Sequence, residues 1–169
     1  MIKRTVYTLG ICLGIILSAQ AQTTNHAAYS LFVVSFTKYA SWPQSNNDFK
    51  ITVLGKSKIY DELMKMTANK SVNGQPYKVT QVESVNDLGD SQIIFIPDGK
   101  SSNLDDVMKA TTGKAVMVVT EREGLVRKGA GLSFLVIDNK LRFDINNSEL
   151  EKRNVKVSGN LVSIANSSM

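Results

Sequence analysis

The sequence predicts an α/β fold, a three-layer sandwich with a mixed sheet of about five strands. Helical and strand patterns alternate along the chain as far as residue 119, which is typical of parallel βαβ units with right-handed crossovers. Segments 92–96 and 115–119 are almost wholly apolar, as expected of strands covered on both faces. Segments 132–137 and 141–145 are joined by a short link, so they form an antiparallel hairpin, which a closing helix follows.

The first helix is expected over residues 25–41. Asn25 is suited to cap its start, because a side-chain oxygen there accepts a hydrogen bond from the first turn. Trp42 and Pro43 should end it, since the residue before a proline avoids the helical backbone conformation. The stripe expected to face the core comprises Ala28, Leu31 and Val34, widened by Phe32, Phe36, Tyr39 and Ala40.

The next elements form the first βαβ unit. A strand rich in β-branched residues is expected at 50–54 and ends at Gly55, after which Ser57 caps a second helix. Residues 69–76 make a turn-rich connection to a more exposed strand at 77–82.

A third helix follows the first apolar strand. It is expected to begin at Ser101 or Ser102 and to end at Gly113, because glycine tolerates the left-handed conformation that commonly terminates a helix.

The closing helical segment is expected from Asn146 to Ala165, with a break around Val155. Asn146 and Glu149 match a capping box, in which each side chain satisfies a backbone N–H group of the first turn.

Residues 1–21 have the features of a signal peptide that is cleaved after Ala21. Lys3 and Arg4 precede an apolar run that is shorter than the roughly 20 residues of a membrane span. Ala19 and Ala21 fit the small-residue pockets of a signal peptidase. An uncleaved N-terminal anchor is the alternative to this interpretation.

Cleavage leaves residues 22–169 as a single exported domain. Its loss of Cys12, the only cysteine, excludes disulfides and thiolate chemistry from the mature chain. The formal net charge of +5 falls to +3 because Lys3 and Arg4 are removed. With so mild a charge and no long basic run, nucleic acid is not an expected partner.

No catalytic residue, metal site or cofactor is predicted. The segment Gly55–Ser57 resembles the end of a P-loop, but the position that needs the first glycine holds Lys50. His26 is the only histidine and lacks the partners of a zinc site or a serine hydrolase.

A glycine-rich loop is one candidate binding feature. Arg127, Lys128, Gly129 and Gly131 place cations beside flexible backbone, a combination that binds anions when N–H groups point outward. The simpler interpretation is a turn leading into the hairpin.

Four other residues are candidate contacts for a protein partner. Tyr39 and Trp42 lie at the end of the aromatic first helix, and interface anchors are rich in such residues. For Trp42 the simpler interpretation is a core anchor. In segment 141–146, Arg142 and Asp144 face the side opposite to the apolar residues.

Six segments, in order over nearly the whole mature chain, resemble the YfiR-like family of periplasmic regulatory proteins. They are residues 36–43 (FTKYASWP), 49–55 (FKITVLG), 93–96 (IIFI), 129–131 (GAG), 140–146 (KLRFDIN) and 161–165 (LVSIA).

The resemblance implies a non-enzymatic periplasmic regulator. Such a protein binds the periplasmic part of a membrane signalling protein, a diguanylate cyclase or a sensor kinase, and restrains its output; with a cyclase it lowers cyclic di-GMP. A homodimer is expected by the same analogy. The disulfides of the family's type member do not carry over, because the mature chain has no cysteine.

The alternative function is binding of a small solute. Open α/β sheets have a crevice at the carboxyl ends of their strands, and Gly55, Pro97 and the Gly129 loop are candidates to line it.

Overall fold

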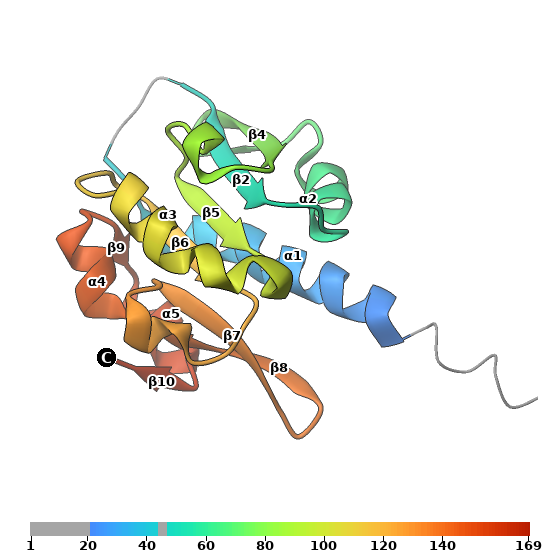
Figure 1. Ribbon diagram of the computed structural model, residues 1–169, viewed down its shortest axis with the longest axis vertical. Helices are drawn as coiled ribbons and strands as arrows, with labels where there is room; N and C mark the ends of the chain where they lie inside the picture. The colour runs from blue at the N-terminus through green and yellow to red at the C-terminus, as the bar shows by residue number, and fades with distance from the viewer. Residues whose placement is uncertain (1–20, 44–46) are drawn as a thin grey trace, which may run out of the picture.

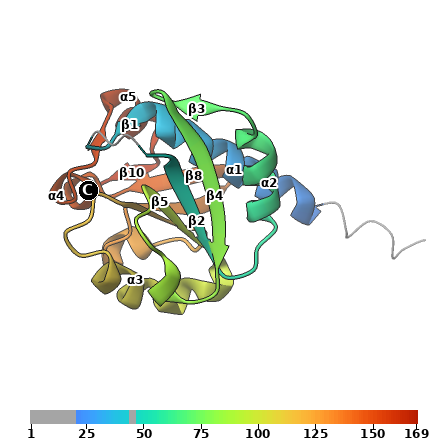
Figure 2. The same cartoon turned by 90° about the horizontal axis from the view of Figure 1, so that it is seen from above.

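A mixed sheet lies between two helical layers (Figures 1 and 2). The computed structural model describes residues 21–43 and 47–169. Helices α1 and α2 cover one face of the sheet and α3 covers the other (Figure 2). The predicted α/β sandwich is confirmed, whereas the predicted signal peptide lies outside the described residues.

The helices are α1 (Ala21–Tyr39), α2 (Ile59–Thr67), α3 (Leu104–Ala110), α4 (Asn147–Lys152) and α5 (Gly159–Ile164), with 3-10 helices η2 (Val85–Asp87), η3 (Asp98–Asn103) and η4 (Leu125–Lys128). The strands are β1 (Ala40–Ser41), β2 (Phe49–Leu54), β3 (Ser71–Val72), β4 (Gln75–Val82), β5 (Ile93–Ile96), β6 (Met117–Thr120), β7 (Leu132–Ile137), β8 (Lys140–Ile145), β9 (Lys156–Val157) and β10 (Ser167–Ser168).

The main sheet has the strand order β10-β8-β7-β6-β5-β2-β4-β3. Strands β4, β2, β5, β6 and β7 run parallel, and β8 returns antiparallel to β7. The sheet therefore has eight strands in place of the predicted five or so. Part of the difference comes from β3 and β10, which have two residues each and carry no recognisable strand pattern in the sequence.

Two apolar cores lie on the two faces of the sheet. The larger one, beneath α1, contains an aromatic group made by Tyr29, Phe36, Phe95, Phe134 and Phe143. The smaller one lies beneath α3, and the apolar side chains of β5 alternate between the two cores. This two-sided burial is why β5 is apolar at every position and β6 at every position except Thr120.

The face of α1 that packs on the sheet differs from the predicted stripe. Tyr29, Val33, Phe36 and Ala40 are buried, whereas Leu31 is 59% exposed. The helix carries apolar residues around most of its circumference, so periodicity did not identify the buried side.

Both ends of the first helix also differ from prediction. The chain is already helical at Ala21, so Asn25 lies within the helix and is not its N-cap. It ends at Tyr39 because Ala40 and Ser41 leave the helix to pair antiparallel with β9. That pairing joins residues more than a hundred positions apart, which local sequence patterns cannot reveal.

The starts of the other helices agree only in part with the predicted caps. At α2 the N-cap position is Lys58, while the Ser57 oxygen is only a distant acceptor, 3.4 Å from the Ile59 nitrogen. At α4 the Asn146 side chain accepts a hydrogen bond from the Glu149 N–H at 2.9 Å, as predicted, but the Asn146 N–H donates to the Gly131 carbonyl oxygen, so the reciprocal half of the capping box does not form. The third helix is preceded by η3, which already begins at Asp98.

The closing segment breaks more extensively than predicted. Between α4 and α5 the chain forms β9, and Val155 is fully buried just before it. Within the described ranges, no helix is both long and apolar enough to cross a membrane.

Candidate functional site

An apolar groove of about 190 Å³ lies between α1 and α5. Its lining residues come from three turns of α1 and from the short α5, and only one of them is polar. They are Leu31, Phe32, Ser35, Phe36, Tyr39, Leu161 and Ile164.

Backbone contacts at the end of α1 hold α5 in this position. Ser158 donates its backbone N–H to the Tyr39 carbonyl oxygen at 2.8 Å. Its hydroxyl oxygen caps α5 by accepting a hydrogen bond from the Leu161 N–H at 3.3 Å. Leu161 is then buried against the sheet, which leaves Ile164, one turn later, at the rim of the groove.

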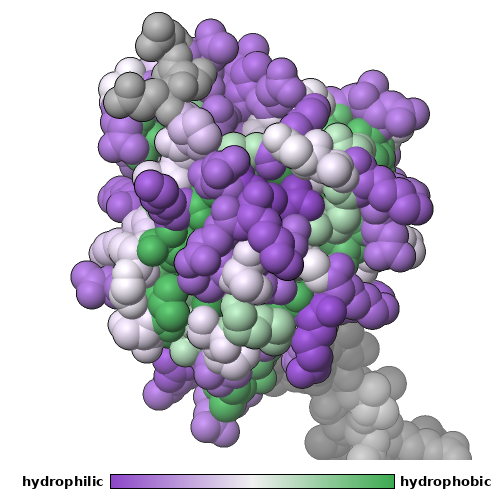
Figure 3. Space-filling model, turned by 90° about the vertical axis from the view of Figure 1, so that its left-hand side faces the viewer, coloured by the Kyte–Doolittle hydropathy of each residue, from purple (hydrophilic) through white to green (hydrophobic). Residues whose placement is uncertain are grey.

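The rim of the groove is apolar and open to solvent. Leu31 is 59% exposed, Tyr39 is 44% exposed and Ile164 is 58% exposed. The side of the molecule that carries α4 contrasts with this, because hydrophilic residues dominate it and hydrophobic ones form smaller patches between them (Figure 3). Exposed large apolar side chains gathered around a groove are a feature of interaction sites.

Trp42 is a half-buried packing residue. Its ring meets Phe49 edge-on at a centroid distance of 5.0 Å. Its indole N–H donates to the Gln92 carbonyl oxygen at 3.1 Å. These contacts supply the core-anchor role that the sequence also allowed, and Trp42 does not line the groove that Tyr39 lines.

Arg142 and Asp144 lie away from Tyr39 and Trp42. Both alternate along β8 with Phe143, which packs beneath α1, so they face the other side of the sheet. Asp144 accepts a hydrogen bond from the Asn166 amide at 2.9 Å, and Arg142 is exposed. The structure therefore does not bring the four candidate residues together.

The glycine-rich loop uses its backbone donors internally. The N–H groups of Arg127, Gly129 and Gly131 donate to backbone carbonyl oxygens at 3.3, 3.2 and 2.9 Å. Gly129 has a positive φ of 100°, and a Cβ there would lie 3.1 Å from the methyl carbon of Met108. These constraints account for the glycine, while Arg127 and Lys128 are exposed on η4.

The crevice expected at the carboxyl ends of the strands is occupied at Gly55 by a side chain. A Cβ on Gly55 would lie 2.5 Å from the Lys100 side chain. The Lys100 ammonium group lies 3.9 Å from the Glu83 carboxylate. At Gly129 the neighbouring side chain is that of Met108.

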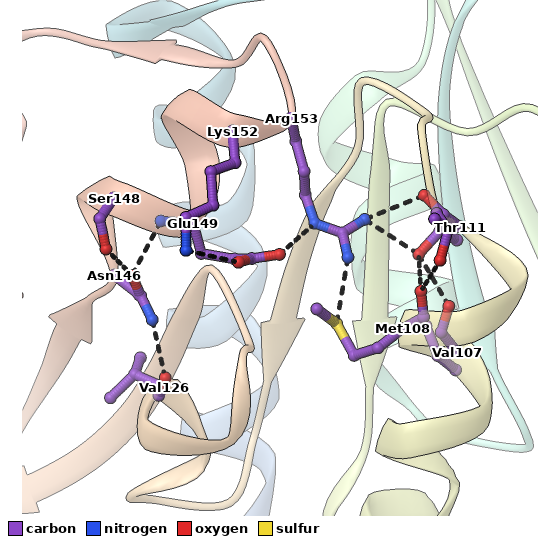
Figure 4. Close-up of polar contacts among 10 residues, drawn as sticks. Val107, Met108, Thr111, Val126, Asn146, Ser148, Glu149, Lys152 and Arg153 are labelled. Carbon is purple, nitrogen blue, oxygen red and sulfur yellow. Dashed lines mark hydrogen bonds and ion pairs between the residues drawn. The ribbon is translucent and has the colours of Figure 1, made fainter.

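A partly buried arginine, Arg153, connects the last turn of α3 with the end of α4 (Figure 4). The Arg153 side chain, 10% exposed, donates to the Glu149 carboxylate at 2.8 Å. It also donates to the Thr111 carbonyl and hydroxyl oxygens, both at 3.1 Å, and lies 3.6 Å from the Met108 sulfur. The i, i+4 spacing of Glu149 and Arg153 was the available signal, but it could not show the contact with α3.

Ionisation of the Tyr29 phenol is expected to destabilise the protein in alkaline solution. Burial raises the pKa of its phenol above the ordinary 10.0, and the carboxylates of Glu121 and Asp98 raise it further. Above pH 10.0 the unfolded chain therefore binds fewer protons at this residue than the folded chain does. The free energy of unfolding should fall as the pH rises through this range.

Urea denaturation at a series of pH values between neutrality and the alkaline range measures this effect. Tyr29→Phe, which cannot ionise, should show a shallower decline than the wild type. Equal slopes for the wild type and Tyr29→Phe would contradict the prediction.

Fold and groove together define an α/β sandwich with an open apolar groove between α1 and α5. Among residues 21–43 and 47–169, no group of three or more His, Cys, Asp or Glu side chains could hold a metal ion. The chain belongs to the YfiR/HmsC-like family, whose family model matches residues 26–166. This is a family of periplasmic, regulatory and non-catalytic proteins. A search of curated proteins finds no match.

Proposed function

We propose that this protein is exported, is cleaved after Ala21, and regulates a membrane signalling protein by binding its periplasmic part. The partner is a diguanylate cyclase or a sensor kinase, and binding restrains its output. Membership of the YfiR/HmsC-like family supports this role, and the α1–α5 groove is the surface on this chain best suited to it.

The observation that carries the proposal is the exposure of Leu31, Tyr39 and Ile164 around one apolar groove. Burying such side chains against a partner is favourable by about 25 cal/mol for each Å² of apolar surface removed from water. Anchor residues at interfaces commonly enter pockets surrounded by contacts that exclude water. The groove therefore receives an apolar side chain of the partner, and the exposed residues seal its rim.

The size of the groove favours a protein anchor over a free solute. Its volume of about 190 Å³ is below the roughly 300–1,000 Å³ of typical small-molecule pockets. A single large side chain of a partner, presented from a rigid element, needs no larger space.

The first test captures the receptor from membranes of the producing organism with the mature protein as bait. Wild-type protein should recover an inner-membrane cyclase or kinase. Ile164→Asp should reduce recovery about tenfold or more, because it places an unpaired carboxylate at an apolar contact. Met64→Asp is the matched control, since Met64 is 45% exposed on α2, outside the groove.

Recovery of no membrane receptor by the wild type would refute the proposal. Equal recovery with Ile164→Asp would exclude the groove as the contact. A second copy of this chain is the competing occupant of the groove, and sedimentation of the wild type and Ile164→Asp tests for it. A dimer that forms in the wild type and is lost in Ile164→Asp would assign the groove to the second copy.

The direction of regulation is tested in cells that lack this protein. With a cyclase as partner, cyclic di-GMP should rise when the gene is deleted and should fall again when wild-type protein is restored. Restoring Ile164→Asp should leave the level high. A level that falls on deletion would contradict restraint.

A further inference from the structure

The β7–β8 hairpin extends beyond the strands on both sides of it. On one side β6 pairs with β7 only at Leu132 and Ser133. On the other side β10 pairs with β8 only at Asp144 and Ile145. Within the described part of the chain, residues 135–142 therefore form a two-stranded arm without neighbouring strands, which projects from the body in Figure 1.

The outer edge of β8 already accepts one strand of this chain. The Phe143 carbonyl oxygen accepts a hydrogen bond from the Asn166 N–H at 2.8 Å, and the Ile145 carbonyl oxygen accepts one from the Met169 N–H at 3.1 Å. Backbone groups that point to one edge recur at every second residue. The N–H and C=O groups of Leu141 therefore point to the same edge, beyond the reach of β10.

The side chains of the arm define the chemistry of what would pair there. Val136 is 56% exposed and Ile137 is 39% exposed, both unusual for apolar residues in a strand. Lys140 and Arg142 are exposed on β8, and no ion pair involves either of them in the described part of the chain. A strand added at the β8 edge would place acidic residues beside these cations and apolar residues beside Leu141, whose side chain lies on the opposite face together with its cross-strand partner Val136.

The arm is continuous with the α1–α5 groove. The Asn166–Phe143 hydrogen bond holds the end of α5 against the edge of β8. Ile164, two residues before Asn166, forms the rim of the groove. A segment lying along the arm therefore leads directly to the groove.

We propose that the arm binds an extended segment of the membrane receptor as an added strand on the β8 edge. In that segment acidic and apolar residues alternate. The inference rests on the proposed function, because it gives the same partner a second contact. A membrane surface fits the arm less well, since Asp138 and Asn139 form its tip and would enter the bilayer first.

The probe is a capped hexapeptide of alternating glutamate and valine, added to isotope-labelled mature protein. Hydrogen exchange and chemical shifts should change at the amides of Leu141 and its neighbours in the arm. A lysine–valine hexapeptide should cause no such change. Binding should weaken as salt is added, because exposed charges are screened within about 10 Å at 0.1 M salt.

Two matched variants test the charge contribution. Arg142→Glu should weaken peptide binding about tenfold. Lys109→Glu reverses a cation that is 80% exposed on α3, and it should leave binding unchanged.

Three results would overturn the inference: no change at the arm amides, equal weakening by both variants, or binding to phosphatidylglycerol vesicles that Arg142→Glu abolishes. Receptor capture separates this inference from the proposed function. Capture lost in Ile164→Asp but unchanged in Arg142→Glu would refute only the arm. Capture absent in the wild type would refute the proposed function.

Discussion

Phe36→Ala is expected to lower the free energy of unfolding by about 3–5 kcal/mol, the cost of removing a large aromatic side chain from a packed core. Phe36 is fully buried between α1 and the hairpin strands. Its ring packs edge-on against Phe143 at 5.2 Å and is stacked with Phe134 at 6.0 Å. Alanine would leave a void that these rings cannot fill without leaving their own positions.

Urea denaturation followed by circular dichroism measures this effect. Lys38→Ala is the control, because Lys38 is exposed on the same helix and its replacement should change stability by less than about 0.5 kcal/mol. A similarly small change in the free energy of unfolding for both variants would show that the aromatic group contributes little to the packing of α1. Since small proteins have only about 5–15 kcal/mol in total, Phe36→Ala should also lower the yield of folded protein.

Arg153→Ala is expected to lower the free energy of unfolding by about 2–4 kcal/mol, the range for removing a buried and multiply bonded charge. The variant leaves the Glu149 carboxylate and the Thr111 carbonyl oxygen without their arginine donor. It also removes the side-chain link between α3 and α4 that Figure 4 shows.

The neighbouring Lys152→Ala is the matched control. The Lys152 ammonium lies 4.0 Å from the same Glu149 carboxylate, but its side chain is 73% exposed. Solvent weakens such a pair, so its loss should cost less than about 1 kcal/mol. Equal losses for the two variants would contradict the importance of the contact with Thr111. Arg153→Lys should recover only part of the stability, because an ammonium cannot reproduce the guanidinium fork.

Most of the fold could be predicted from local patterns, each contained within a short stretch of sequence. Alternating helices and strands predicted the parallel sheet, and the wholly apolar segments predicted β5 and β6. The hairpin was also predictable, because only a short link separates its two strand segments. In the structure Asp138 and Asn139 form a two-residue turn there, with positive φ values of 49° and 58°. Strands β1, β3, β9 and β10 were missed, since two residues cannot display a periodic pattern.

The candidate site was predictable only in part. Tyr39 was identified from its position at the end of an aromatic helix, and it does lie on the groove. Ile164 belongs to a segment identified only as a closing helix, and Leu31 was expected in the core. The groove depends on where α5 packs, and a hydrogen bond between Ser158 and Tyr39 holds it there.

By itself the sequence determined the α/β class, the order of most elements, and the absence of cysteine from any chain cleaved after Ala21. These properties depend on composition and on periodicity within single elements. Only the tertiary structure decided which side of α1 faces the sheet, because that helix is apolar around most of its surface and either side can be buried. The sheet covers Phe36 and leaves Leu31 to solvent, and that choice creates the groove.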